Sequence, residues 1–186
     1  MSAQNVFVGR KGTGKSANLI HASGIIGADL QNLVCLIKPV GYEIEGLVRL
    51  FAGYSRKDIK GYVIESLWKF MLYTELAKAA VEQINQAELW RLTEEDSRAL
   101  VDLLEDEKQA FAGDFSVRLE LAVKRLHLVP EIEASDAFRK GISEALHIAA
   151  IGKVRTLLAR VLNRKKQVVL LVDNLVRIWP FTCYSV

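Results

Sequence analysis

Short apolar runs mark three candidate strands, at residues 6–8, 33–37 and 168–172. Runs of this kind, without polar alternation, are typical of strands in a parallel sheet, and the last run predicts a strand buried on both faces. Between the first two runs, a glycine-rich stretch is followed by a helical pattern at residues 16–22. A strand, a loop, a helix and a second strand in this order predict a βαβ unit.

The middle of the chain, from residue 42 to about residue 164, carries helical spacing. Thr93, which is followed by acidic residues, is a candidate helix N-cap, and residues 146–162 predict a further helix. Residues 115–129 fit either a strand or a helix, and their helical neighbours favour the helix. The clearest apolar stripe, in steps of three and four, comprises Val63, Ile64, Leu67, Trp68, Met71, Leu72, Leu76 and Ala80.

Composition narrows the class of protein without identifying it. The chain has 186 residues, of which 51% are hydrophobic and 25% are charged, so one globular domain is expected. A net charge of +3 indicates neither a nucleic-acid partner nor a membrane surface. Cys35 and Cys183 are too few for a disulfide framework. Because the chain starts without a signal-peptide pattern and charges interrupt the apolar stretch at 63–84, we expect a cytoplasmic protein.

The glycine-rich stretch matches the P-loop pattern G-x-x-x-x-G-K-[ST]. Glycines allow the backbone to turn its N–H groups toward a phosphate, and the start of the next helix adds free N–H groups and a positive dipole end. In this pattern Lys15 reaches the β- and γ-phosphates, and the Ser16 hydroxyl is a ligand of Mg²⁺. The predicted nucleotide-binding residues are Gly9, Arg10, Lys11, Gly12, Thr13, Gly14, Lys15, Ser16 and Ala17.

Asp173 directly follows the candidate strand at residues 168–172. A carboxylate at the carboxyl end of a strand, in a chain with a P-loop, is typical of the Walker B acid that holds Mg²⁺. The candidate metal ligands are therefore Ser16 and Asp173, and the candidate catalytic residues are Lys15 and Asp173.

The position after Asp173, where a glutamate often activates the attacking water, holds Asn174. Glu43 and Glu45 follow the second candidate strand and are alternative bases, but the polar face of a helix explains them more simply. The base that hydrolysis requires is therefore not identified by the sequence.

Two charged runs and two tryptophans have simpler explanations than a binding site. We expect Trp68 and Trp90 in the core and the charged runs on solvated helix faces, and nucleic acid is not an expected partner. The basic run comprises Arg155, Arg160, Arg164, Lys165 and Lys166, and the acidic run comprises Glu94, Glu95, Asp96, Asp102, Glu105, Asp106 and Glu107.

The stretch 7–17, the stretch 38–43 and the strand at 168–174 together resemble bacterial P-loop ATPases of a group similar to the KAP and STAND-type NTPases. This resemblance extends to about Leu175 and implies a long helical insertion between the Walker motifs. It also implies, by analogy, a signalling or defence ATPase. In such proteins a second acid is usual where this chain has Val176, and further strands follow. The chain is therefore expected to be a C-terminally truncated or frame-shifted product, or one segment of a longer protein.

The expected fold class is α/β: an incomplete P-loop NTPase sheet in a single domain, residues 1–186, with a mostly helical insertion at 42–165. The expected function is binding of Mg²⁺ and ATP with hydrolysis of ATP, either alone or with a homo-oligomeric or other protein partner. A nucleotide-binding module with negligible turnover is the alternative, and phosphoryl transfer to a small molecule is a third reading. The absence of the guanine-reading pattern Asn-Lys-x-Asp favours ATP over GTP.

Overall fold

The computed structural model describes residues 10, 12–38, 41–54, 57–86, 95–130 and 135–173, except for the side chains of 41–45, 57, 58 and 135. Several sequence predictions therefore lie outside the described part of the structure: the strand at 6–8, the motif residues Gly9 and Lys11, the side chains of Glu43 and Glu45, the burial of Trp90, the N-cap at Thr93, and everything from Asn174 onward. The other predicted elements can be compared with the structure.

Two parallel strands, β1 (Asn32–Ile37) and β2 (Gln167–Val172), form the described sheet. Their register pairs Asn32 with Gln167 at one end and Ile37 with Val172 at the other. The N–H of Asp173 continues the ladder by donating to the Ile37 carbonyl at 2.9 Å. Both strands predicted for this part of the chain are confirmed, and their carboxyl ends lie side by side although 135 positions separate their residue numbers (172 − 37).

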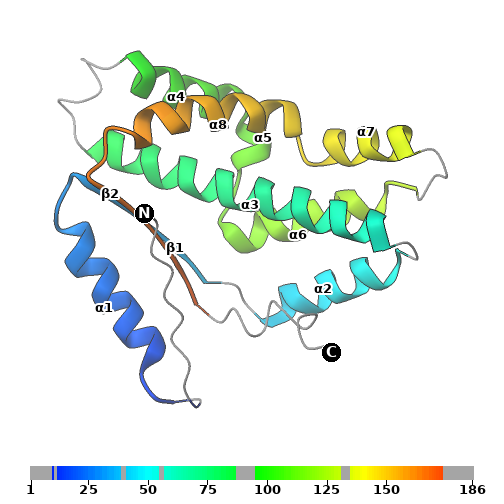
Figure 1. Cartoon of the computed structure of the whole chain (residues 1–186), viewed down its shortest axis with the longest axis horizontal. Coiled ribbons are helices and arrows are strands. Elements are labelled where there is room, and N and C mark those ends of the chain that lie inside the picture. Colours follow the sequence, from blue (N-terminus) through cyan, green and yellow to red (C-terminus); the bar gives the residue numbers. More distant parts are fainter. Residues whose placement is uncertain are drawn as a thin grey trace.

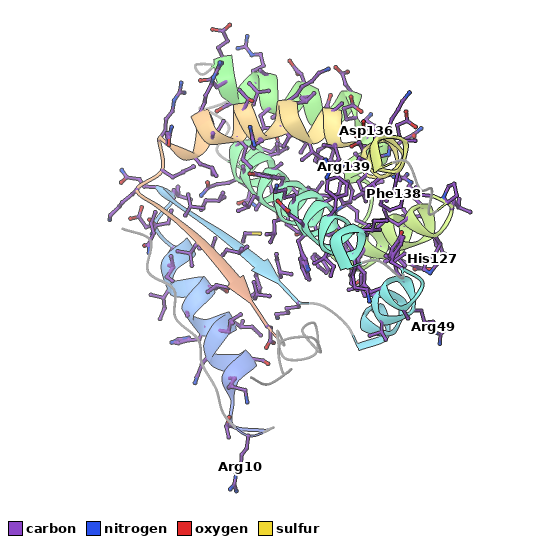
Figure 2. The ribbon with its side chains drawn as sticks, turned by 45° about the vertical axis from the view of Figure 1, so that its right-hand side comes forward. Arg10, Arg49, His127, Asp136, Phe138 and Arg139 are labelled. Carbon is purple, nitrogen blue, oxygen red and sulfur yellow. The ribbon has the colours of Figure 1, made fainter. Side chains whose placement is uncertain are left out.

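One helix lies against each face of β1 (Figure 1). On one face, α1 (Lys15–Gly27) approaches Val34 through Gly27. On the other face, α3 (Lys57–Gln86) covers β1, and Gln83 donates to the carbonyls of Leu30 and Asn32 at 3.1 and 2.8 Å. Figure 2 shows α1 standing apart from the other helices, with Arg10 at its outer end.

The described residues between β1 and β2 form helices, as their spacing predicted. After α2 (Gly41–Ala52) and α3 come α4 (Glu95–Asp106), α5 (Lys108–Phe111), α6 (Phe115–His127), α7 (Ser135–Ala145) and α8 (Ile148–Leu162). None of the helices in the described part of the chain is both long enough and apolar enough to cross a bilayer. The segment that fitted either structure is helix α6, which Asp114 starts by accepting a hydrogen bond from the Val117 N–H at 2.9 Å.

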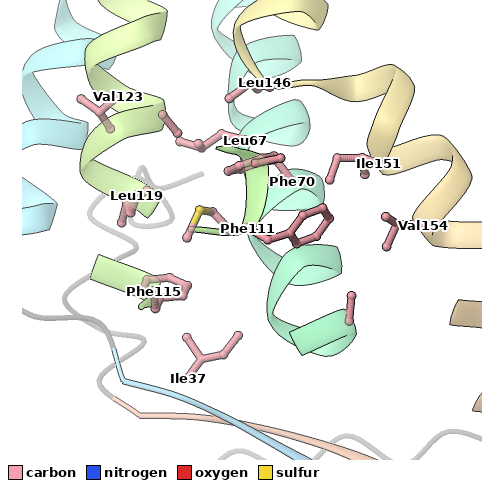
Figure 3. Close-up of a cluster of buried hydrophobic side chains, with 14 of the residues drawn as sticks. Ile37, Leu67, Phe70, Phe111, Phe115, Leu119, Val123, Leu146, Ile151 and Val154 are labelled. Carbon is pink, nitrogen blue, oxygen red and sulfur yellow. The ribbon is translucent and has the colours of Figure 1, made fainter. Parts of the chain in front are cut away.

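The core lies between α3, α6, α7, α8 and the inner face of β1 (Figure 3). Met71 and Val154 are fully buried, and Ile37 carries this core onto the sheet. Trp68 is partly buried against the same cluster, as predicted. These helices therefore pack on each other and on one face of β1. The carboxyl ends of the strands lie at the edge of this packed region.

One prediction about burial is wrong, and one confirmed helix starts two residues later than predicted (148 − 146). β2 is not buried on both faces, because Val168 and Leu170 are each 40% exposed. Val168 and Leu170 lie on the same face of the sheet as their partners Leu33 and Cys35. On that face α3 packs against β1, so it covers β2 only in part. The helix predicted at 146–162 begins at Ile148, because His147 takes a left-handed conformation that interrupts it.

Candidate functional site

The glycine-rich loop leads directly into α1, which begins at Lys15 with Gly14 as its N-cap. Gly12 and Gly14 have φ angles of 87° and 76°, in the left-handed region that glycine adopts at little cost. A Cβ at either position would meet nothing within 4 Å, so the backbone conformation, and not lack of space, requires glycine there. Two motif residues, Gly9 and Lys11, lie outside the described residues.

Lys15 folds back over this loop. Its Nζ donates to the Arg10 carbonyl at 2.7 Å and to the Thr13 hydroxyl oxygen at 3.3 Å. The Thr13 hydroxyl also donates to the Arg10 carbonyl, at 2.9 Å. The loop residues Arg10 and Thr13 thus hold the Lys15 ammonium beside the start of α1.

The first turn of α1 contains backbone N–H groups of the kind that bind anions at helix N-termini. The Asn18 N–H makes the first bond along the helix, to the Gly14 carbonyl at 2.9 Å, so the N–H groups of residues 15–17 precede the helical ladder. Ser16 and Ala17 are exposed, and no acidic residue lies in this turn. The positive end of the helix dipole therefore faces outward beside a lysine and a serine hydroxyl.

Topology places Asp173 at the same edge as this helix start. α1 packs against the strand that follows it, with only residues 28–31 between them, so the two elements run in opposite directions. The 13 residues of α1 and the six of β1 each span about 20 Å. The N-terminus of α1 therefore lies toward the carboxyl ends of β1 and β2, where Asp173 is half-buried (Figure 1).

The alternative bases Glu43 and Glu45 lie in the first turns of α2, shortly after β1. Their side chains are outside the described part of the structure, so the structure does not test this reading.

A buried ion pair, which no sequence pattern predicted, lies behind β1. Arg118 of α6 is 2% exposed, pairs with Glu75 of α3, and donates to the Gly113 carbonyl at 2.6 Å. Burial lowers the pKa of Arg118 to about 10 and raises the pKa of the Cys35 thiol to about 11. Cys35 is therefore an uncharged core residue at neutral pH, and the ion pair joins two helices.

A hollow of about 460 Å³ opens beside the carboxyl end of β1. Three of its polar side chains have structural partners: Lys78 donates to the Gly113 carbonyl, Asp114 caps α6, and Glu75 pairs with Arg118. The hollow is lined by Leu36, Lys38, Glu75, Lys78, Asp114, Phe115 and Ser116. Its mixed charges do not define a ligand of one kind.

Much of the basic run has structural partners. Arg160 and Arg164 contact the Asp96 carboxylate at 3.3 and 2.9 Å, which joins the end of α8 to the start of α4. Lys166 contacts Asp29 at 3.0 Å, at the amino edge of the sheet. Within the described ranges, no group of three or more His, Cys, Asp and Glu side chains is placed to hold a metal ion, and the acidic run forms no such cluster.

Comparisons with protein-family models, with curated proteins and with solved structures found no match to this chain. The assignment of a function therefore rests on the residues of the chain and their arrangement, above all on the loop that opens α1.

Proposed function

We propose that this chain binds a nucleoside triphosphate, with ATP and Mg²⁺ as the bound species, through a P-loop at the start of α1. The observation that carries the proposal is the helix start at Lys15, with two left-handed glycines immediately before it. Consecutive amides, a helix dipole and a lysine at one point favour a polyphosphate over other anions.

The donors available for Mg²⁺ fit that ion. Ser16 offers a hydroxyl oxygen and Asp173 a carboxylate, and magnesium prefers oxygen ligands and retains several waters, so two protein ligands are enough. Mg²⁺, when bound, would neutralise charge on the phosphate oxygens. A P-loop NTPase fold of the α/β class, with the helices α2 to α8 inserted between the two motifs, is part of the same proposal.

Hydrolysis of ATP would be an in-line attack of water on the γ-phosphate. Lys15 would exchange its loop partners for phosphate oxygens and stabilise the charge that develops on them. The loop N–H groups would hold the phosphates in place. A base for the attacking water is not identified within the part of the chain that the structure describes.

Nucleotide binding with negligible turnover is the second candidate, and Asn174 favours it because it occupies the position of a possible base. Signalling or defence activity, a homo-oligomeric or other protein partner, and residence in the cytoplasm remain proposals that rest on the resemblance and on the sequence. None of them identifies a biological effector.

The test is a titration of the purified chain with non-hydrolysable ATP and GTP analogues, with and without Mg²⁺, followed by measurement of phosphate release from ATP. We expect saturable binding that strengthens with Mg²⁺ and prefers the ATP analogue. Asp173→Asn should weaken the Mg²⁺ dependence, whereas Lys38→Ala, a cation at the same sheet edge outside the motif, should change little. Absence of binding at millimolar nucleotide would refute the proposal.

A further inference from the structure

The junction between α7 and α8 is conformationally unusual. His147 lies between the two helices with φ 50° and ψ 40°. Among the residues that the structure describes, it is the only one other than glycine with a positive φ. A histidine in the left-handed region is uncommon, and side chains are held there only by their surroundings.

The backbone at this junction remains hydrogen-bonded on both sides. The His147 N–H donates to the Glu144 carbonyl at 3.2 Å, and the His147 carbonyl accepts from the Ile151 N–H at 3.0 Å. The turn between α7 and α8 is therefore hydrogen-bonded on both sides, and the left-handed backbone of His147 sets the angle between the two helices.

The imidazole of His147 is tied to a third helix. Nη1 of Arg125, on α6, lies 2.7 Å from His147 Nε2. A guanidinium can only donate, so Nε2 must accept, and the ring is neutral with its proton on Nδ1. A proton added at Nε2 would remove the acceptor lone pair and place two cations in contact, so this hydrogen bond cannot survive protonation.

The charged groups around the ring come from several elements. Burial, and then the charge of Arg125, lower the pKa of His147, while Glu107 at the start of α5 opposes the shift. On α7, Glu144, whose carbonyl accepts from the His147 N–H, pairs through its side chain with Lys140.

α7 is anchored mainly through apolar and aromatic contacts. Phe138, Ile142 and, at the same spacing, Leu146 are each at most 2% exposed. The Phe138 ring packs edge-on against Tyr54, and the Arg139 guanidinium lies 5.4 Å from the centre of the Tyr62 ring on α3. The link from Arg125 to His147 adds a polar attachment to α6 at the end of this stripe (Figure 3 shows Leu146 above the core). Beyond the junction, α8 runs directly into β2, whose end carries Asp173.

We propose that the α7–α8 junction is a pH-sensitive hinge, in which protonation of His147 breaks its bond to Arg125 and loosens α7 from α6. This proposal does not depend on nucleotide binding. The fold favours the neutral ring, so the junction is fully closed above the ordinary histidine pKa of about 6.5. It loosens as the pH falls below that value toward the lower pKa of the folded state.

The test is hydrogen–deuterium exchange of peptides that cover α7, measured at pH 7.5 and pH 5.0 and corrected for the intrinsic exchange rate. In the wild-type chain we expect about tenfold or more faster corrected exchange at the lower pH, as for loss of one hydrogen bond to a charged group. His147→Asn should show no such change, because asparagine tolerates the left-handed conformation but does not titrate.

Two further variants separate the hinge from general effects of acid. His127→Asn is the control, because His127 is an exposed histidine at the end of α6 whose Nδ1 lies 2.9 Å from the Val123 carbonyl of the same helix, and this variant should keep the wild-type response. Arg125→Gln keeps a donor without its charge, so the transition should move to higher pH. Exchange of α7 that is independent of pH, or a pH response that persists in His147→Asn, would overturn the proposal.

A measurement on the wild-type chain tests the proposal even if the variants fail to fold. The ¹⁵N shifts of the His147 ring should report a neutral Nδ1–H tautomer at pH 8 and a pKa below 6.5. An Nε2–H tautomer, or a pKa above 6.5, would equally refute the hinge.

Discussion

At the scale of single residues, the buried pair of Arg118 and Glu75 places two charges out of contact with most of the solvent. Both charges leave water, and the remaining hydrogen-bonding capacity of the arginine is partly met by the Gly113 carbonyl. Such a pair adds little net stability, but each member becomes costly without the other.

Arg118→Leu should therefore lower the free energy of unfolding by about 3–5 kcal/mol, because it leaves the Glu75 carboxylate buried alone. The double variant Arg118→Leu with Glu75→Leu should recover most of that loss. Chemical denaturation of the wild type, both single variants and the double variant measures the coupling. A double variant as unstable as the sum of the two single variants would contradict this account.

Lys15 is the residue on which the proposed function depends most directly. Lys15→Ala removes a charge-assisted contact with phosphate, worth about 1.5–3 kcal/mol, so the affinity for ATP should fall about tenfold or more. Isothermal titration with an ATP analogue and Mg²⁺ measures the change, with Lys38→Ala as the matched lysine outside the loop. Equal affinities in wild type and Lys15→Ala would remove the basis for a P-loop.

At the scale of elements, the start of α6 shows how a short signal decides between helix and strand. Gly113 has φ 79° and Asp114 caps the helix, so the chain turns and begins a helix within two residues. The apolar positions Phe115, Leu119 and Leu126 then face the core. The cap and the packing against neighbouring helices therefore favour a helix, although the segment's alternating pattern is also typical of a strand.

Gly113→Ala should destabilise the protein by about 1–3 kcal/mol, because alanine is strained at this φ and its Cβ would lie 2.6 Å from Val117 Cγ1. Gly152→Ala is the opposite case: it lies inside α8, where a Cβ meets nothing within 4 Å. That variant should stabilise by about 0.5–1 kcal/mol. Thermal unfolding followed by circular dichroism compares the two, and a Gly113→Ala variant as stable as wild type would refute the assigned turn.

At the scale of the whole molecule, the structure contains more of what the proposed nucleotide binding requires than of what hydrolysis requires. The loop and the start of α1 are formed, whereas hydrolysis also needs an oriented water and stabilised transition-state charge. We therefore expect the chain to bind nucleotide but to hydrolyse it only slowly.

A steady-state assay of phosphate release on monodisperse protein measures this imbalance. We expect turnover well below about 1 s⁻¹, the low end of the usual enzyme range. Turnover at or above that rate, abolished by Asp173→Ala, would show that the chain contains complete hydrolytic machinery.

The sequence by itself determined the local features of this protein. Residues 12–16 predicted a loop followed by a helix, because left-handed glycines and a helix start are properties of consecutive residues. The helical middle followed in the same way from spacing in steps of three and four, and β1 and β2 from apolar runs.

Only the tertiary structure decided which distant residues meet. Arg118 and Glu75 are 43 positions apart (118 − 75), and Arg125 and His147 are 22 apart. Neither pair has a periodic signature, because each depends on how α6 packs against α3 and against the α7–α8 junction. The exposure of Val168 has the same origin: an apolar run predicts a strand, but the helix packed against its neighbour sets how much of it is covered.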